Sequence, residues 1–207
     1  MNTFFEVILV LFYTILCLWG INKWNYFTTS EIPKKWLNGL FVLKISVGFL
    51  LYLVYTQFYT VRSEADIFKY FDDSLVVYNG LFQSPIDYLQ LVFFRAPDNE
   101  YFFDNYYEKM NHWANLHNSL FYGDSVLMIK INAFFRLFSF GSFHVHSIFF
   151  NFLSLIGLVG IYRFFKSFVK LNSLWLIGVV FCLPSVLFWS SSVLKESLLI
   201  LLLGVIC

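Results

Sequence analysis

The sequence contains little charge. Asp, Glu, Lys and Arg make up 13% of its 207 residues, whereas soluble globular proteins average about 25%. With 59% hydrophobic residues, the chain cannot cover a water-exposed surface, and a water-soluble enzyme is excluded. Intrinsic disorder is excluded by the same composition, because low hydrophobicity is what keeps a chain unfolded. The formal net charge of +1 gives no basic surface of the kind that binds nucleic acid.

Cysteine is also scarce. Cys17, Cys182 and Cys207 all lie in apolar stretches, where cysteine behaves as a small hydrophobic residue. Their number and spacing indicate neither a disulfide framework nor a metal site. Aromatic residues are abundant instead, with 28 Phe and 13 Tyr. Together these features indicate an integral membrane protein.

Four apolar stretches predict membrane spans, since about 20 helical residues cross a hydrocarbon core about 30 Å thick. They cover residues 4–20, 40–59, 143–162 and 174–189. A fifth apolar stretch begins near Ser197 and reaches Cys207 after about 11 residues, which rise only about 16 Å in a helix. We therefore expect the sequence to be the N-terminal part of a longer protein.

The distribution of charge predicts an orientation for these spans. Residues 21–44 hold four Lys and one Glu, and residues 163–170 hold three basic residues and no acid. Residues 62–140 hold ten acidic and six basic residues. Because Lys and Arg are enriched in cytoplasmic loops, the two basic segments are predicted to be cytoplasmic. The long acidic segment is then external or periplasmic.

The long segment is rich in aromatic residues and has a helical pattern. Helices are predicted over residues 66–78, 86–94 and 124–138, with Ser84 as a cap and Pro85 at the first position of the second helix. Amphipathic helices of this kind lie in the plane of the membrane interface. The predicted apolar stripes are Ile67, Tyr70, Phe71, Ser74, Leu75 and Tyr78 in the first helix, and Val126, Leu127, Ile131, Phe134, Phe135 and Phe138 in the third.

The predicted fold is therefore all-α: a polytopic transmembrane helix bundle with a long external loop of amphipathic interfacial helices. Residues 1–61 are expected to form two transmembrane helices and a basic cytoplasmic loop. Residues 62–141 are expected to form the external loop, and residues 142–207 further transmembrane helices that continue beyond the sequence.

Acidic residues gather where the second span leaves the membrane, in Arg62-Ser63-Glu64-Ala65-Asp66. One interpretation is that Asp66 caps the helix that follows, since acids are favoured at helix N-termini. The other is that Asp66 or Glu64 is a general base that removes a proton from a hydroxyl group. Both interpretations are kept.

Two further groups of polar residues have weaker patterns. Asp72 and Asp73 are adjacent and point in different directions on a helix, so a solvated helix face is the favoured interpretation. His112, His117, Asp104 and Glu108 could surround a metal ion, but their spacing matches no known signature. No metal site or cofactor is predicted, although a divalent metal is left open.

The stretch LPSVLFWSSSVLKES, residues 183–197, combines features that are costly in a membrane. Pro184 should kink the fourth span, and Lys195–Glu196 must reach water or each other. Lys195 could bind a phosphate as a point charge, or the pair could be an interfacial turn. Lys44 is placed near the cytoplasmic end of the second span, where it can snorkel. No span then hides a charge at its centre, which argues against an ion-coupled carrier.

The order of these features resembles the GT-C class of integral-membrane glycosyltransferases, in particular bacterial members with a Pro-Ser…Phe-Trp-Ser-Ser…Lys-Glu segment. The resemblance covers about residues 45–200, including the acidic start of the external segment and the span in SFGSFHVHSIFFNFLSLIGLVGIYRFF. It implies a multi-pass protein of the bacterial inner membrane. One departure is the helix that precedes the usual first span, which places the predicted N-terminus outside.

The resemblance also implies an activity. The donor would be a sugar on a polyprenyl phosphate, and the acceptor an envelope lipid, glycan or protein. Asp66 matches the position of the catalytic base, with Glu64 beside it. Lys195 and Arg62 would bind the donor phosphate. Tyr70, Phe71 and Glu196 match supporting positions.

Two alternatives stay open. The first is a polysaccharide polymerase of the O-antigen type, although such enzymes use Arg-rich external loops, and only Arg62 and Arg95 flank the acidic cluster here. The second is non-enzymatic: an accessory membrane subunit of an envelope assembly, or a lipid or solute carrier.

Overall fold

The computed structural model describes residues 3–28, 32–95, 97–113, 123–170 and 172–207. Its regular elements within these ranges are all helices, so the fold is all-α. The chain divides into two compact units. The first comprises Met1–Val54 and His144–Cys207, and the second comprises Tyr55–Phe143.

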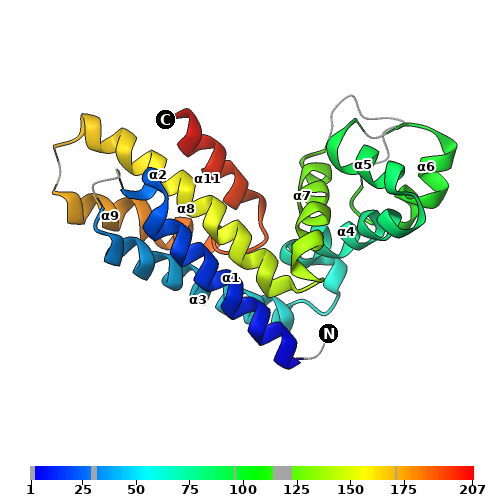
Figure 1. Cartoon of the computed structure of the whole chain (residues 1–207), viewed down its shortest axis with the longest axis horizontal. Coiled ribbons are helices and arrows are strands. Elements are labelled where there is room, and N and C mark those ends of the chain that lie inside the picture. Colours follow the sequence, from blue (N-terminus) through cyan, green and yellow to red (C-terminus); the bar gives the residue numbers. More distant parts are fainter. Residues whose placement is uncertain (1–2, 29–31, 96, 114–122, 171) are drawn as a thin grey trace. The chain divides into compact units, whose positions relative to one another are not determined.

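The helices of the two units are labelled in Figure 1. The first unit is built from α1 (Thr3–Lys23), α2 (Asn25–Thr28), most of α3 (Lys34–Phe58), α8 (Phe143–Phe168), α9 (Ser173–Phe181), α10 (Pro184–Trp189) and α11 (Lys195–Ile206). The second unit contains the short 3-10 helix η1 (Arg62–Glu64), α4 (Asp66–Gln83), α5 (Pro85–Phe93), α6 (Glu100–Asn105), the 3-10 helix η2 (Tyr107–Lys109) and α7 (Asp124–Ser139).

Helices α1, α3 and α8 are each long and apolar enough to cross a membrane. They correspond to the first three predicted spans, the second of which was predicted to end one residue later, at Tyr59. Helix α8 is the most enclosed: 56% of its most apolar stretch is buried, against 17% for α1. Large apolar side chains of α1, such as Phe12, Ile15 and Trp19, are exposed. An apolar surface of this kind is expected where a helix faces lipid.

The fourth predicted span is not one continuous helix. Helix α9 ends at Phe181, and α10 begins at Pro184, which occupies its first turn. Proline lacks the backbone N–H that would continue the helix and clashes with the preceding turn. The sequence predicted a kink at Pro184, whereas the structure has a complete break. Helices α9 and α10 have 9 and 6 residues, and each alone is shorter than the roughly 20 residues that a span needs.

Helix α11 runs alongside α8 in the first unit (Figure 1). A Cβ atom built on Gly157 would collide with the carbonyl of Ile200, and one built on Gly160 would collide with the carbonyl of Gly204. The two backbones therefore touch at points where only glycine fits. Small residues allow this close approach of helices in membrane proteins.

The second unit has its own core, in which α4 packs against α7 and α5. The predicted Ser84–Pro85 start is confirmed: the Ser84 hydroxyl accepts the Asp87 backbone N–H, and Pro85 opens α5. Buried aromatic side chains fill the space between the helices. They include Phe71, Tyr88, Phe102, Tyr106, Tyr107 and Trp113.

The predicted apolar stripe of α7 is confirmed in part. Val126 is buried and Ile131, Phe134 and Phe135 are half-buried, but Leu127 and Phe138 are exposed. The buried face also includes Ile129, Asn132 and Arg136, which were not predicted. Helix α7 carries apolar residues on more than one face, so its periodicity alone could not select the face that packs. The stripe of α4 is closer to the prediction, with Ile67 through Ser74 mostly buried and Leu75 exposed.

Candidate functional site

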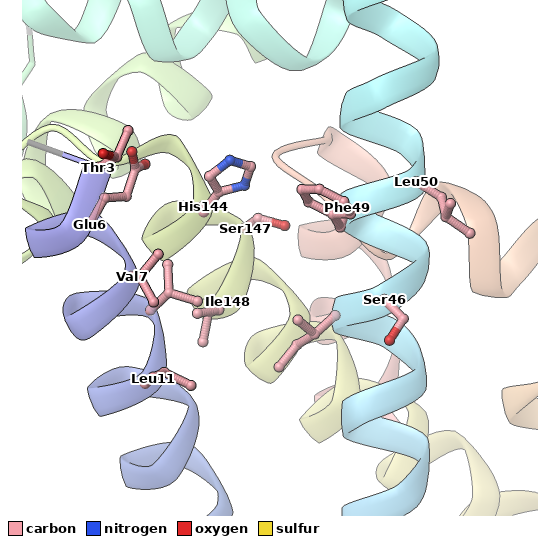
Figure 2. Close-up of a pocket in the computed structure, with 12 residues that line it drawn as sticks. Thr3, Glu6, Val7, Leu11, Ser46, Phe49, Leu50, His144, Ser147 and Ile148 are labelled. Carbon is pink, nitrogen blue, oxygen red and sulfur yellow. The ribbon is translucent and has the colours of Figure 1, made fainter. Parts of the chain in front are cut away.

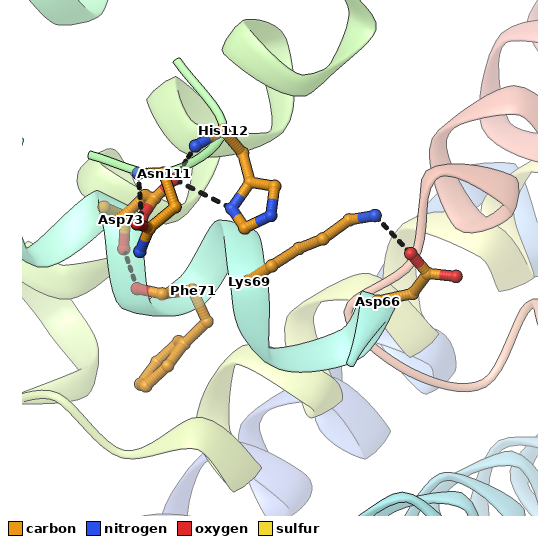
Figure 3. Close-up of polar contacts among 7 residues, drawn as sticks. Asp66, Lys69, Phe71, Asp73, Asn111 and His112 are labelled. Carbon is orange, nitrogen blue, oxygen red and sulfur yellow. Dashed lines mark hydrogen bonds and ion pairs between the residues drawn. The ribbon is translucent and has the colours of Figure 1, made fainter. Parts of the chain in front are cut away.

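Asp66 is the first residue of α4. The N-cap position belongs to Ala65 and makes no side-chain cap bond, so the prediction that Asp66 caps the helix is wrong. The Asp66 carboxylate instead pairs with the ammonium group of Lys69, one turn along the helix (Figure 3). Half of the Asp66 side chain is exposed, which leaves the carboxylate accessible to a hydroxyl group.

The pKa of Lys69 reflects this pairing. Partial burial alone would lower it, but the hydrogen bond and charge of Asp66, together with Tyr70, raise it above its usual value. Lys69 is therefore held as a cation beside the Asp66 carboxylate. The two charges form an ion pair at the start of α4, where the helix dipole also favours an acid.

Arg62 and Glu64 lie in η1, just before α4. The Arg62 guanidinium donates to both carboxylate oxygens of Asp72, with Nε–Oδ2 2.7 Å and Nη2–Oδ1 3.0 Å. It also lies 3.9 Å from the centre of the Phe68 ring. Asp72 is therefore an ion-pair partner as well as part of an exposed face. A phosphate bound by Arg62 would have to share the guanidinium group with Asp72 or displace the Asp72 carboxylate. The side chain of Glu64 is exposed.

The prediction that Asp73 lies on a solvated face is wrong. Its side chain is only 4% exposed, and its carboxylate accepts the backbone N–H groups of Asn111 (3.2 Å) and His112 (2.7 Å). The Nδ1 atom of His112 lies 3.2 Å from the same carboxylate. Figure 3 shows the His112 ring beside α4, turned toward Asp73. The buried Asp73 carboxylate therefore fixes both the backbone and the ring of His112 beside α4.

Four of these side chains share one face of α4. Asp66, Lys69, Tyr70 and Asp73 are spaced i, i+3, i+4 and i+7, which are neighbouring positions on a helix. The Lys69 ammonium lies 5.0 Å from the centre of the Tyr70 ring, and Tyr70 meets His112 edge to face at 6.2 Å. The spacing along α4 was visible in the sequence. The contribution of His112 was not, because it comes from a segment about 40 residues away.

The predicted supporting residues Tyr70 and Phe71 are both buried. The guanidinium of Arg136 lies 4.2 Å from the centre of the Phe71 ring, and it donates to the Phe71 carbonyl at 2.6 Å and the Ser74 hydroxyl at 2.8 Å. Burial lowers the pKa of Arg136 to about 10, although Asp72 acts in the opposite direction. This cation, which the sequence did not single out, fixes α7 to α4.

The first unit contains the other predicted site residues. Lys195 opens α11 and is partly exposed, and Glu196 beside it is exposed. The segment before them, residues 190–194, is not helical and is buried. Lys195 therefore follows directly from a buried stretch of irregular backbone.

The prediction that Lys44 snorkels is wrong. Its side chain is only 1% exposed, and it lies well inside α3, which begins at Lys34. Its ammonium donates to the Ser190 carbonyl (2.9 Å), the Ser190 hydroxyl (2.5 Å) and the Ser191 hydroxyl (3.3 Å). No carboxylate in the described ranges forms an ion pair with it. A candidate span therefore does bury an ionisable residue, and the reason given above against an ion-coupled carrier no longer holds.

A cavity of about 680 Å³ lies in the first unit between α1, α3 and α8 (Figure 2). Most of its wall is apolar, including Val7, Phe49 and Ile148. Glu6 from α1 and His144 from α8 are the ionisable groups in the wall. Pockets with mostly apolar walls and a few polar groups are typical of sites for small organic ligands.

No group of three or more His, Cys, Asp and Glu side chains in the described part of the chain is arranged to hold a metal ion. Of the four residues considered above, His117 lies outside the described residues. His112 is engaged with Asp73.

Comparisons of the chain with protein-family models, with curated proteins and with solved structures find no match. The function is therefore inferred from the residues themselves.

Proposed function

We propose that the protein is a membrane glycosyltransferase that transfers a sugar from a polyprenyl-phosphate donor to an envelope lipid, glycan or protein. The observation that carries the proposal is the accessible Asp66 carboxylate at the start of α4. It follows the candidate span α3 by a few residues. This is where a base would meet a lipid-linked donor, whose reacting carbon lies close to the membrane surface.

In the proposed reaction, Asp66 accepts the proton of an acceptor hydroxyl. The hydroxyl oxygen forms a bond to the anomeric carbon while the bond from that carbon to the phosphate oxygen breaks. Polyprenyl phosphate leaves with the bonding electrons, and inversion at the anomeric carbon is expected. Arg62, in the same unit as Asp66, stabilises the charge that develops on the phosphate. The prediction that Lys195 binds a lipid phosphate is kept as a separate part of the proposal. In this proposal the site faces the external side of a bacterial inner membrane, as the charge distribution of the sequence predicts.

The proposal is tested with purified protein in lipid nanodiscs. The donors are radiolabelled undecaprenyl-phosphate glucose, mannose and arabinose, and the acceptor is an envelope extract. We expect Asp66→Asn to reduce transfer by about 100-fold or more, the usual effect of losing a general base. Asp104→Asn, at an exposed acid of α6, is the matched control. A wild-type protein that transfers none of these sugars, or an Asp66→Asn variant with full activity, contradicts the proposal.

A solute or lipid carrier is the second candidate, and the buried Lys44 favours it. Ionisable residues inside spans and interrupted helices are both common in transporters. Both occur here, at Lys44 and at the break between α9 and α10. Uptake of a solute into proteoliposomes that is abolished by Lys44→Met, without any sugar transfer, would favour this candidate.

A further inference from the structure

Residues 190–194, between α10 and α11, form an irregular segment inside the first unit. Ser190, Ser191, Ser192 and Val193 have no exposed surface. Buried backbone outside a helix must still pair its carbonyl groups. Within the segment the Leu194 N–H donates to the Ser192 carbonyl at 2.8 Å, whereas the Ser190 and Ser191 carbonyls are paired by other elements. The neighbouring helices supply these partners.

Helix α8 and the start of α11 provide part of the support. Ser154 Oγ donates to the Ser190 carbonyl at 2.9 Å, and Asn151 Nδ2 donates to the Ser191 carbonyl at 3.0 Å. Ser197 Oγ donates to the Ser192 carbonyl at 3.0 Å. Three successive carbonyls are thus held by side chains, which fixes the course of the segment as it enters α11.

Helix α3 provides the rest. A Cβ atom on Gly48 would collide with the Ser191 carbonyl, so only glycine allows the segment to lie this close to α3. One turn before Gly48, the Lys44 ammonium binds the Ser190 carbonyl and the hydroxyls of Ser190 and Ser191. Lys44 is the one titratable group among these contacts, and its side-chain nitrogen reaches three atoms of the segment.

We propose that Lys44 is a positioning residue that holds residues 190–194 and thereby sets where Lys195 meets the phosphate of a lipid ligand. The inference rests on the proposed function, which gives Lys195 the donor phosphate. Lys195 comes directly after the held segment. Motion of residues 190–194 would therefore change the position of the Lys195 ammonium group. Lys44 itself is buried and touches no phosphate.

The first experiment measures the segment without any ligand. Backbone hydrogen exchange is followed by mass spectrometry on the full chain in nanodiscs. Lys44→Met is expected to speed exchange by about tenfold or more at residues 190–195 while α8 stays protected. Lys35→Met, at an exposed lysine in the first turn of the same helix, is the matched control. Unchanged exchange in Lys44→Met overturns the proposal.

The second experiment asks whether Lys44 acts through Lys195. Binding of undecaprenyl phosphate is measured for the wild type, Lys44→Met, Lys195→Met and the double variant. Each single variant is expected to bind about tenfold more weakly. The double variant is expected to bind no more weakly than Lys195→Met, because residues that act as one unit are not additive. Independent effects, about 100-fold in the double variant, overturn the proposal.

The two proposals fail in different ways. A wild type that neither binds undecaprenyl phosphate nor transfers sugar contradicts the proposed function, and hydrogen exchange then decides separately whether Lys44 holds the segment.

If Lys44→Met does not fold, Ser190→Ala replaces it. That variant removes the shortest contact of the ammonium group but keeps the charge, and about threefold faster exchange is expected at residues 190–195. No change in Ser190→Ala overturns the proposal.

Discussion

Two adjacent carboxylates on α4 have opposite surroundings. Asp72 forms an ion pair with Arg62 in which both side chains are about half exposed. Asp73 is buried and holds two backbone N–H groups and the His112 ring. Exposed ion pairs contribute little to stability, whereas a buried donor left without a partner costs about 1–3 kcal/mol. Substituting Asp72 and Asp73 in turn therefore compares the contributions of an exposed and a buried carboxylate to the free energy of unfolding.

Asp73→Ala is expected to lower the free energy of unfolding by about 2–3 kcal/mol, because three donors lose their acceptor. Asp72→Ala, the matched control, is expected to lower it by at most about 1 kcal/mol. Thermal unfolding of the full chain in detergent, followed by near-UV circular dichroism, measures the difference. Equal effects of the two substitutions would contradict the environment described for Asp73.

Single residues also show where the sequence was insufficient. The surroundings of Lys44 depend on serines 146 residues later in the chain, and those of Asp73 depend on a segment 38–39 residues later. A periodic pattern reports on neighbours within a few turns of a helix. It therefore located the acidic start of α4 but not the partners that bury Lys44, Asp73 and Arg136.

At the scale of helices, the crossing of α8 and α11 depends on glycines at the contact. Gly157, Gly160 and Gly204 each lie against backbone of the opposite helix. A larger residue would force the helices apart, and overpacking of this kind costs about 1–3 kcal/mol. Gly178 in α9 has open space around the position where a Cβ would lie, so the same substitution there has no steric cost.

Gly157→Ala is accordingly expected to lower the unfolding temperature of the protein in detergent. Gly178→Ala is expected to leave it unchanged or to raise it, since alanine favours a helix over glycine by about 1 kcal/mol. Differential scanning fluorimetry on the two variants tests this. The reverse order of stability would show that α8 and α11 do not cross at Gly157.

Helices with one clear sequence feature, such as a long apolar stretch or a Ser-Pro start, could be predicted. Segments in which two features conflict could not. The apolar lengths of α1, α3 and α8 exceed what a span needs, and the Ser84–Pro85 start identified α5. The region after Leu174 has the same apolar character, but Pro184 divides it into two short helices. In α7, several faces are apolar, and the packing of α4 decides which one is buried.

At the scale of the whole molecule, the orientation in the membrane is still a prediction. It rests on the lysines before the second span and on the acids of the long segment after it. In a variant with Cys17, Cys182 and Cys207 replaced by serine, Glu100→Cys is expected to react with a membrane-impermeant maleimide on intact cells. Lys35→Cys is expected to react only after permeabilisation. The opposite pattern would reverse the proposed topology and move the Asp66 site to the cytoplasmic side.

The burial of Lys44 also has a consequence for biosynthesis. Its side-chain nitrogen is bound by Ser190 and Ser191, which the ribosome adds 146 and 147 residues later. At about 5–20 residues per second, this delay is roughly 7–30 s. During that time the nascent α3 carries an unpaired lysine, which costs about 2.5–3.5 kcal/mol at the centre of a helix in the translocon. For this candidate span to insert before Ser190 and Ser191 are made, the apolar residues around Lys44 must offset the cost alone.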